Sequence, residues 1–151
     1  MLSQMQFNIQ YEDALDLPSG ELVNVFEKLS FIRIIEVVEQ SPVMLFSATL
    51  MKHKSIDDVN TIPAMELKEV LSSNGRDVLF STRMSGPIAR LIVSQNDAWP
   101  IAPILIESKQ LVLSMQGTPQ GLSTFLTQVK QLIGPRFSTG HSHHQVRLAS
   151  R

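Results

Sequence analysis

The chain has 151 residues, of which 43% are hydrophobic and 18% are charged, and its formal net charge is −1. This composition is typical of a globular protein, and the balanced charge gives no global attraction to nucleic acid or to a membrane surface. Cysteine is absent, which excludes disulfides, thiolate catalysis and cysteine metal sites. No apolar run approaches the roughly 20 residues of a membrane span, so we expect a cytoplasmic protein without membrane contact.

The first part of the chain alternates strand-like and helix-like patterns. Residues 5–11 alternate apolar and polar side chains, as expected of a half-buried strand. Ser19 is a suitable cap for a helix that follows it. The buried face of this helix is predicted to contain Leu22, Val23, Phe26 and Leu29. Two apolar stretches come next and predict strands over residues 31–38 and 43–51.

The middle of the chain contains the clearest turn signal. Residues 55–58, with a serine first and an aspartate last, have the spacing of a capping box and predict a short helix. Residues 65–71 predict a strand, and residues 77–84 predict the strand that returns beside it. Between them lies the dipeptide Asn74-Gly75, which tolerates the positive φ angles of a type I′ hairpin turn.

A helix opened by Pro87 and reaching Asn96 leads into a second predicted hairpin, with strands over residues 101–106 and 111–115. Four polar residues separate these strands. Prolines at positions 100 and 103 cannot donate to a β-ladder, so the first of these strands is predicted to lie at an edge or to begin irregularly.

The last regular element is predicted to be an amphipathic helix. Gly117 breaks the strand pattern, Thr118 is placed as the N-cap, and Pro119 occupies the first helical position. The apolar face is formed by residues at helical spacing, namely Leu122, Phe125, Leu126, Val129, Leu132 and Ile133. Gly134 and Pro135 end the helix.

This order of elements predicts an α+β protein made of two successive ferredoxin-like (βαββαβ) halves, with antiparallel sheets and helices packed on one face. The first half is expected over residues 1–74 and the second over residues 75–136. Residues 137–151 are expected to form a flexible tail with, at most, a short final strand. The Asn-Gly turn is too tight for a flexible linker, so the two halves are expected to pack as one body.

Histidines and acidic residues offer few candidates for chemistry. His141, His143 and His144 could bind a transition metal, but their Ser- and Gly-rich context favours a solvated tail, so we assign no metal site and no cofactor. His53 lies between two lysines in a polar segment, which favours a solvated loop. Asp58 is better explained as a helix cap than as a catalytic acid, so no catalytic residue is assigned.

Ligand binding has three candidate residues. Arg83 and Arg90 lie near the start of the predicted helix at Pro87, where they could meet an anionic ligand. Trp99 precedes a strand within a proline-flanked segment. The seven methionines of the chain would supply an adaptable apolar lining for a small-molecule pocket.

Residues 65–133 resemble the regulatory region of archaeal regulators of the bacterio-opsin activator type. The resembling residues are a strand and turn over residues 67–76, the hairpin entry at Pro100 and Pro103, the polar turn over residues 107–109, and Gly117 before the helix with Leu122, Phe125 and Leu126. The resemblance implies paired ACT-like or ferredoxin-like units in a regulatory domain. In that family a helix-turn-helix that binds DNA follows, and no such pattern is present in this chain.

We therefore expect a non-catalytic regulatory or interaction protein that acts through dimerisation, with small-ligand sensing in transcriptional control. Its expected partners are a second copy or a regulatory protein, and DNA contact is expected only indirectly or through the tail. Two alternatives stay open. One is a small enzyme using His53 or a carboxylate in a cleft. The other is a nucleic-acid-associated module that uses the arginine-containing tail.

Overall fold

The computed structural model describes residues 2–10, 21–107, 110–133 and 141–142 of the chain. Its strands are β1 (Ser3–Gln10), β2 (Phe26–Val38), β3 (Ser41–Leu50), β4 (Met65–Asn74), β5 (Asp77–Met84), β6 (Ala98–Glu107), β7 (Gln110–Gly117) and β8 (His141–Ser142). Its helices are α2 (Leu22–Val25), the 3-10 helix η2 (Ile56–Thr61), α3 (Pro87–Val93) and α4 (Pro119–Ile133).

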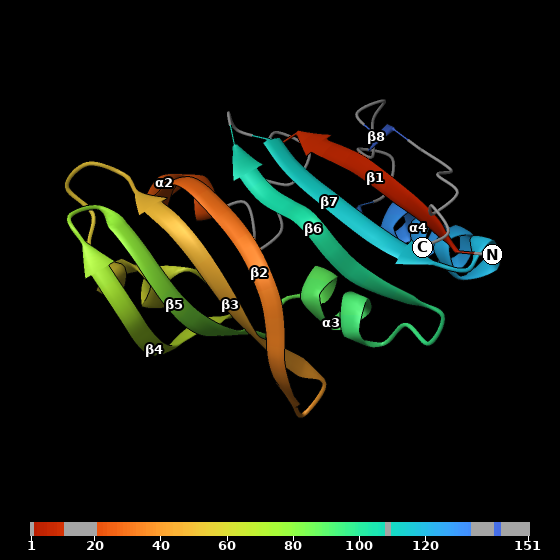
Figure 1. Ribbon diagram of the computed structural model, residues 1–151, viewed down its shortest axis with the longest axis horizontal. Helices are drawn as coiled ribbons and strands as arrows, with labels where there is room; N and C mark the ends of the chain where they lie inside the picture. The colour runs from red at the N-terminus through yellow and green to blue at the C-terminus, as the bar shows by residue number, and fades with distance from the viewer. Residues whose placement is uncertain (1, 11–20, 108–109, 134–140, 143–151) are drawn as a thin grey trace, which may run out of the picture.

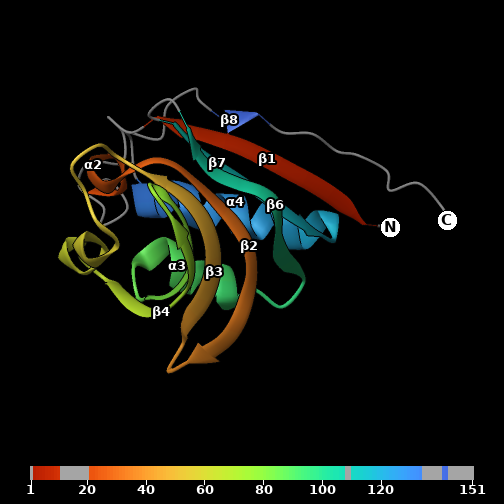
Figure 2. The same cartoon turned by 60° about the vertical axis from the view of Figure 1, so that its left-hand side comes forward.

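All described strands belong to one sheet of eight strands in the order β4-β5-β3-β2-β6-β7-β1-β8, and neighbouring strands are antiparallel. Figure 1 shows this sheet crossing the whole molecule. Helix α3 contacts β3 and β6, whereas α4 contacts β1, β6 and β7. The sheet curves around these two helices (Figure 2), which confirms the predicted α+β class with helices on one face.

The strand pairings cross the boundary expected between residues 74 and 75. Strand β1 from the first expected half pairs with β7 of the second, and β5 of the second half lies between β4 and β3 of the first. The two expected ferredoxin-like halves are therefore not confirmed as separate sheets. Strands that are distant in sequence can pair within one sheet. The order of elements along the chain does not specify which strands become neighbours.

Strand β2 begins earlier than predicted because bulges imitate helical spacing. The predicted helix containing Phe26 and Leu29 ends at Val25, and both residues belong to β2. Register shifts between β2 and β3 leave Glu27, Ile32 and Ile35 without a directly opposed partner. Each extra residue changes the spacing of core-facing side chains from two to three, so a bulged strand resembles a helix at the level of sequence.

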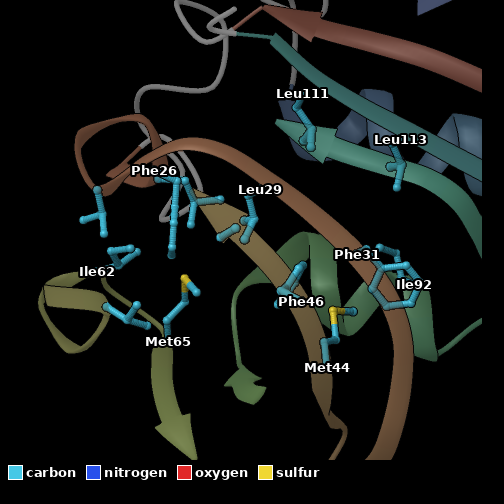
Figure 3. Packing of buried hydrophobic residues seen from close by; sticks show 14 of the residues in the cluster. Phe26, Leu29, Phe31, Met44, Phe46, Ile62, Met65, Ile92, Leu111 and Leu113 are labelled. Carbon is cyan, nitrogen blue, oxygen red and sulfur yellow. The ribbon is translucent and has the colours of Figure 1, made fainter. Parts of the chain in front are cut away.

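Aromatic rings fill the core beneath β2, β3 and β5. Phe26 and Phe80 are stacked with ring centroids 5.7 Å apart, and Phe46 stacks on Phe80 at 5.9 Å. Phe31 meets Phe46 edge to face at 6.1 Å. All four rings are buried, and Figure 3 shows Phe26, Phe31 and Phe46 pointing to the same side of the sheet. Such pairs stabilise a core by about 0.5–1.5 kcal/mol each beyond their buried area.

The predicted hairpin between β4 and β5 is confirmed, but its turn is shifted by one residue. Asn74 pairs with Asp77, so the two central residues are Gly75 and Arg76. Gly75 has a φ of 64°, which glycine adopts without steric penalty, and Arg76 is not at positive φ. The turn therefore differs from the type I′ geometry centred on the Asn-Gly dipeptide.

The second predicted hairpin and the helix after it are also confirmed. Glu107 pairs with Gln110 between β6 and β7, and the register of these strands shifts between Ile101 and Leu105. The Thr118 hydroxyl accepts a hydrogen bond from the Gly121 N–H at 3.0 Å, as expected of the N-cap of α4. This helix covers β1 and β7 with a face whose centre, Phe125, is fully buried.

The predicted tail contains one short described strand. His141 and Ser142 form β8, which pairs with Phe7 and Gln6 of β1. The remaining tail positions, including His143 and His144, lie outside the described residues, as do Ser19 and Tyr11. Within the ranges that the structure describes, each helix is too short or too polar to cross a membrane.

Candidate functional site

An apolar cavity of about 90 Å³ lies between the sheet and helix α3. Its lining residues are apolar or glycine and come from all parts of the sheet except β1 and β8: Leu22, Leu29, Met44, Phe46, Pro63, Ala64, Met65, Met84, Gly86, Pro87, Ile88, Ala89, Ile92, Ile104, Leu111 and Leu113. Figure 3 shows several of these side chains, from β2, β3, β4, α3 and β7, projecting into one interior.

Helix α3 closes one side of this cavity, and its sequence explains where it begins. Gly86 is the N-cap, and Pro87 occupies the first turn, where its missing N–H has no helical partner to lose. Ala89 and Ile92 are the buried residues of the helix. The small side chain of Ala89 leaves space that a larger residue would occupy, so the helix covers the cavity without filling it.

The loop before β4 also lines the cavity and is bonded to the segment that leads into α3. The Ser85 N–H donates to the Ala64 carbonyl oxygen at 2.8 Å, and the Ser85 hydroxyl lies 3.3 Å from the same oxygen. Ala64 has a φ of 65°, an uncommon conformation for a non-glycine residue. Pro63 is exposed and Pro87 is partly exposed, so the lining of the cavity reaches the protein surface at these two residues.

The lining determines what the cavity can bind. It offers no charged or hydrogen-bonding side chain, so burying an ionic or strongly polar molecule there would leave that molecule's polar groups without partners. An apolar cavity of this kind stays dry and accepts neutral apolar molecules. Met44, Met65 and Met84 are flexible and polarizable, which allows the lining to adapt to ligand shape.

The three ligand-binding candidates from the sequence lie in separate places. Arg83 is opposite Val43 on the sheet face away from the core, where its Nη2 donates to the Val38 carbonyl oxygen at 3.2 Å and lies 3.7 Å from Glu39 Oε2. Arg83 therefore holds the β2–β3 turn. Arg90 is exposed on α3, which packs on the inner face.

Trp99 lies far along the sheet from Arg83, in β6. Its indole Nε1–H donates to Gln116 Oε1 on the adjacent strand β7 at 2.9 Å, and the side chain is 40% exposed. Neither Trp99 nor the two arginines line the apolar cavity. The structure thus does not bring these three residues together around one ligand.

A second, more open hollow of about 520 Å³ lies beside α3 and α4. Arg90 and Gln128 line it together with Val37 and Gln40 from the tip of the β2–β3 hairpin. Gln95 Nε2 donates to Gln128 Oε1 at 2.9 Å and links the end of α3 to α4. This hollow borders β2 at Val37.

The catalytic candidates do not converge within the described residues. His53 is exposed, at a φ of 68°, and Asp57 is exposed at a position further along the chain. Asp58 Oδ2 accepts the Ser55 N–H at 2.8 Å, which confirms the predicted capping box at the start of η2. No group of three or more His, Asp or Glu side chains in the described ranges is placed to hold a metal ion.

Sequence reasoning did not locate the apolar cavity. Its lining combines residues from α2 to β7, and no local motif indicates that these positions meet. The methionine content was the one signal that pointed toward an adaptable apolar lining. Comparison of the chain with protein-family models, with curated proteins and with solved structures finds no match.

Proposed function

We propose that this protein is a non-catalytic regulatory protein that binds a small, neutral, apolar molecule in the cavity beneath α3. The observation that carries this proposal is the cavity itself, which is lined by apolar residues of α3 and of strands β2 to β7. Pockets with an apolar lining at the meeting point of packed elements are the usual sites of small-molecule binding.

The position of the cavity supports a sensing role. A ligand there would touch α3, the core strands β3 and β4, and Leu111 and Leu113 of β7 at once. Binding would stabilise the arrangement of these elements that forms the cavity, because a ligand shifts an equilibrium by its preference for one state. The short helix α3 is the element best placed to change position in response.

The regulatory setting of this proposal comes from the resemblance to regulators of the bacterio-opsin activator type. That resemblance suggests ligand sensing in transcriptional control, through dimerisation or through a regulatory protein partner. The element order that suggested ferredoxin-like halves belongs to the same proposal, although the strands of the expected halves interleave in one sheet. Neither alternative function gains a supporting observation, since His53 lies outside the cavity and residues 143–151 lie outside the described ranges.

Thermal unfolding with a neutral apolar probe tests the cavity. Benzene at about ten times its Kd would stabilise the native state by about 1.4 kcal/mol, which corresponds to a rise in Tm of roughly 3–6 °C for a domain of this size. The variant Ala89→Leu places a larger side chain in the cavity and is expected to abolish most of this rise.

A matched control separates cavity filling from a general effect of added volume. Ala48 is also buried but does not line the cavity, so Ala48→Leu is expected to retain the benzene-dependent rise in Tm whatever its own stability. Native mass spectrometry of the purified protein would show any retained natural ligand. An absence of stabilisation in the wild-type protein, or an equal rise in Ala89→Leu, would contradict the proposal.

A further inference from the structure

Strand β2 has a free edge over residues 31–38. It pairs with β3 along its length, but with β6 only at Leu29 and Ser30. Beyond that point the two strands diverge (Figure 1), and no other described strand pairs with this side of β2. Pro100 and Pro103 lack the N–H groups that β6 would need to continue the ladder.

This free edge carries exposed apolar side chains. Ile32 and Ile35 are each 46% exposed, and Val37 is 53% exposed. An unpaired strand edge with exposed β-branched residues is a template for pairing with another strand. Natural edges are often protected by charges or by irregular backbone. This edge has both, in Arg33 and Glu36 and in the register shifts at Ile32 and Ile35, so only a strand that matches its charges and its irregular backbone can pair with it.

The sequence of the free edge is complementary to itself in the antiparallel direction. When two copies align with Ile34 opposite the partner subunit's Ile35, Ile32 lies opposite the partner subunit's Val37. The same register places Arg33 opposite the partner subunit's Glu36 and, by symmetry, repeats that pair on the other side of the axis. Apolar residues thus meet apolar residues, and each charge meets its opposite.

The faces of the sheet agree with this register at its charged pair. Arg33 and Glu36 are both exposed and are opposite Leu45 and Val43, on the face away from the core. Ile34 and Val37 are opposite Met44 and Pro42, on the face toward α3. Directly opposed residues of two paired strands share a face, so the two ion pairs would form together on the outer side of the sheet.

The other described long edge, that of β4, is less suited to self-pairing. The Leu67 N–H on this strand is already bonded to Asn60 Oδ1 at 2.9 Å. A register that pairs Lys68 with the partner subunit's Glu69 would place Leu71 opposite the partner subunit's Glu66. The edge of β4 therefore matches at its centre but places an apolar residue against a charge at both ends of the paired segment.

We propose that two copies of this chain associate through antiparallel pairing of residues 32–37 of β2, with Arg33 of each copy opposite Glu36 of the other. This deepens the proposed regulatory role by assigning its dimerisation to a surface. The dimer rests on the proposed function only for its regulatory role, because the strand pairing itself does not require an occupied cavity. The hollow beside Val37 and Arg90 borders the same edge and would be covered by the second copy.

Charge reversal tests the register. Sedimentation equilibrium across micromolar to millimolar concentrations is expected to show a dimer for the wild-type protein. Arg33→Glu or Glu36→Arg alone would create two like-charged pairs and weaken the dimer about tenfold or more. The double variant Arg33→Glu/Glu36→Arg restores both pairs and is expected to regain most of the affinity, as is an equimolar mixture of the two single variants.

Disulfide trapping gives a second, independent measurement. The wild-type chain has no cysteine, so Ile32→Cys and Val37→Cys introduce single thiols on an otherwise thiol-free chain. A mixture of the two variants is expected to form a covalent heterodimer under mild oxidation. Lys68→Cys mixed with Glu69→Cys serves as the control at the edge of β4 and is expected to remain largely monomeric.

Each outcome decides the proposal without reference to the cavity. A wild-type protein that stays monomeric over the whole range, a dimer that is indifferent to both single reversals, or preferential crosslinking at β4 would overturn it. Weaker dimers of the single variants, together with restored affinity in the double variant, would support the proposal. Misfolding of the single variants would not be corrected by a second exposed charge reversal. Failure of benzene binding would leave this proposal standing.

Discussion

Strands β2–β5 and strands β1, β6 and β7 share one sheet but are paired differently. In the first group the β2–β3 pair has three register shifts and the β4–β5 pair has two, while β3 and β5 pair without a shift. In the second group the β6–β7 pair has one shift, and β1 and β7 pair through eight consecutive positions without any. Strands β2–β5, called the bulged group below, surround the aromatic core. They contribute to the cavity lining and include the free edge of β2. The free edge and most of the cavity lining lie on irregularly paired strands, and Leu111 and Leu113 of the regular β1–β7 ladder complete the lining.

The largest expected effect comes from removing a central ring of the bulged group. Phe80 is fully buried and stacks on both Phe26 and Phe46, so Phe80→Ala is expected to lower the free energy of unfolding by about 3–5 kcal/mol. Urea unfolding followed by circular dichroism measures this loss. A decrease below about 1 kcal/mol would show that the aromatic stack is not central to stability.

The matching change in the other group sharpens the comparison. Phe125 in α4 is also fully buried, and Phe125→Ala is expected to cause a loss of similar size. If the single sheet unfolds as one cooperative unit, both variants will keep one transition. Two separated transitions in either variant would show that the groups unfold independently.

A smaller effect is expected at the junction between β7 and α4. A Cβ on Gly117 would lie against the backbone of Asp97 and 2.7 Å from Ala98 Cα, so Gly117→Ala is expected to destabilise the protein by about 1–3 kcal/mol. Gly75→Ala is the control in the bulged group, because open space surrounds Gly75 and only its positive φ opposes the change, at about 1 kcal/mol. Equal thermal stabilities for both variants would argue against the close approach at Gly117.

The smallest expected effect concerns the cap of α4. Thr118→Ala removes the hydroxyl that accepts the Gly121 N–H and is expected to lower stability by about 1 kcal/mol. Thr124 is exposed in the middle of the same helix, so Thr124→Ala is expected to be neutral or slightly stabilising, since alanine favours helix. Thermal unfolding of both variants would distinguish a capping effect from a general response to losing threonine.

Local signals in the sequence predicted the parts of the fold that local chemistry controls. The hairpin near Gly75, the capping box at Ser55 and the N-cap at Thr118 each depend on a few neighbouring residues. The start of β2 was mispredicted because its bulges place Phe26 and Leu29 three residues apart on one face. A periodicity argument has no means of separating a bulged strand from a helix over so short a stretch.

The candidate site was less predictable than the fold. The cavity depends on the distance between α3 and a curved sheet, and no single residue in the sequence predicts it. Arg83 was selected for its charge, yet its guanidinium holds the β2–β3 turn through Val38 and Glu39. The charge of a side chain indicates which ligands it could bind. The tertiary structure decides whether another group of the protein already occupies that side chain.

The pairing of β1 with β7 has a consequence for how the chain reaches its native state. Gln10 pairs with Gln110, so even the nearest partners in this ladder are 100 residues apart in sequence. At synthesis rates of about 5–20 residues per second, β1 leaves the ribosome roughly 5–20 s before its partner strand exists. Pairings of such high contact order fold slowly, so β1 can join the sheet only after β7 has been synthesised, and fragments that end before β7 would expose β1 to aggregation.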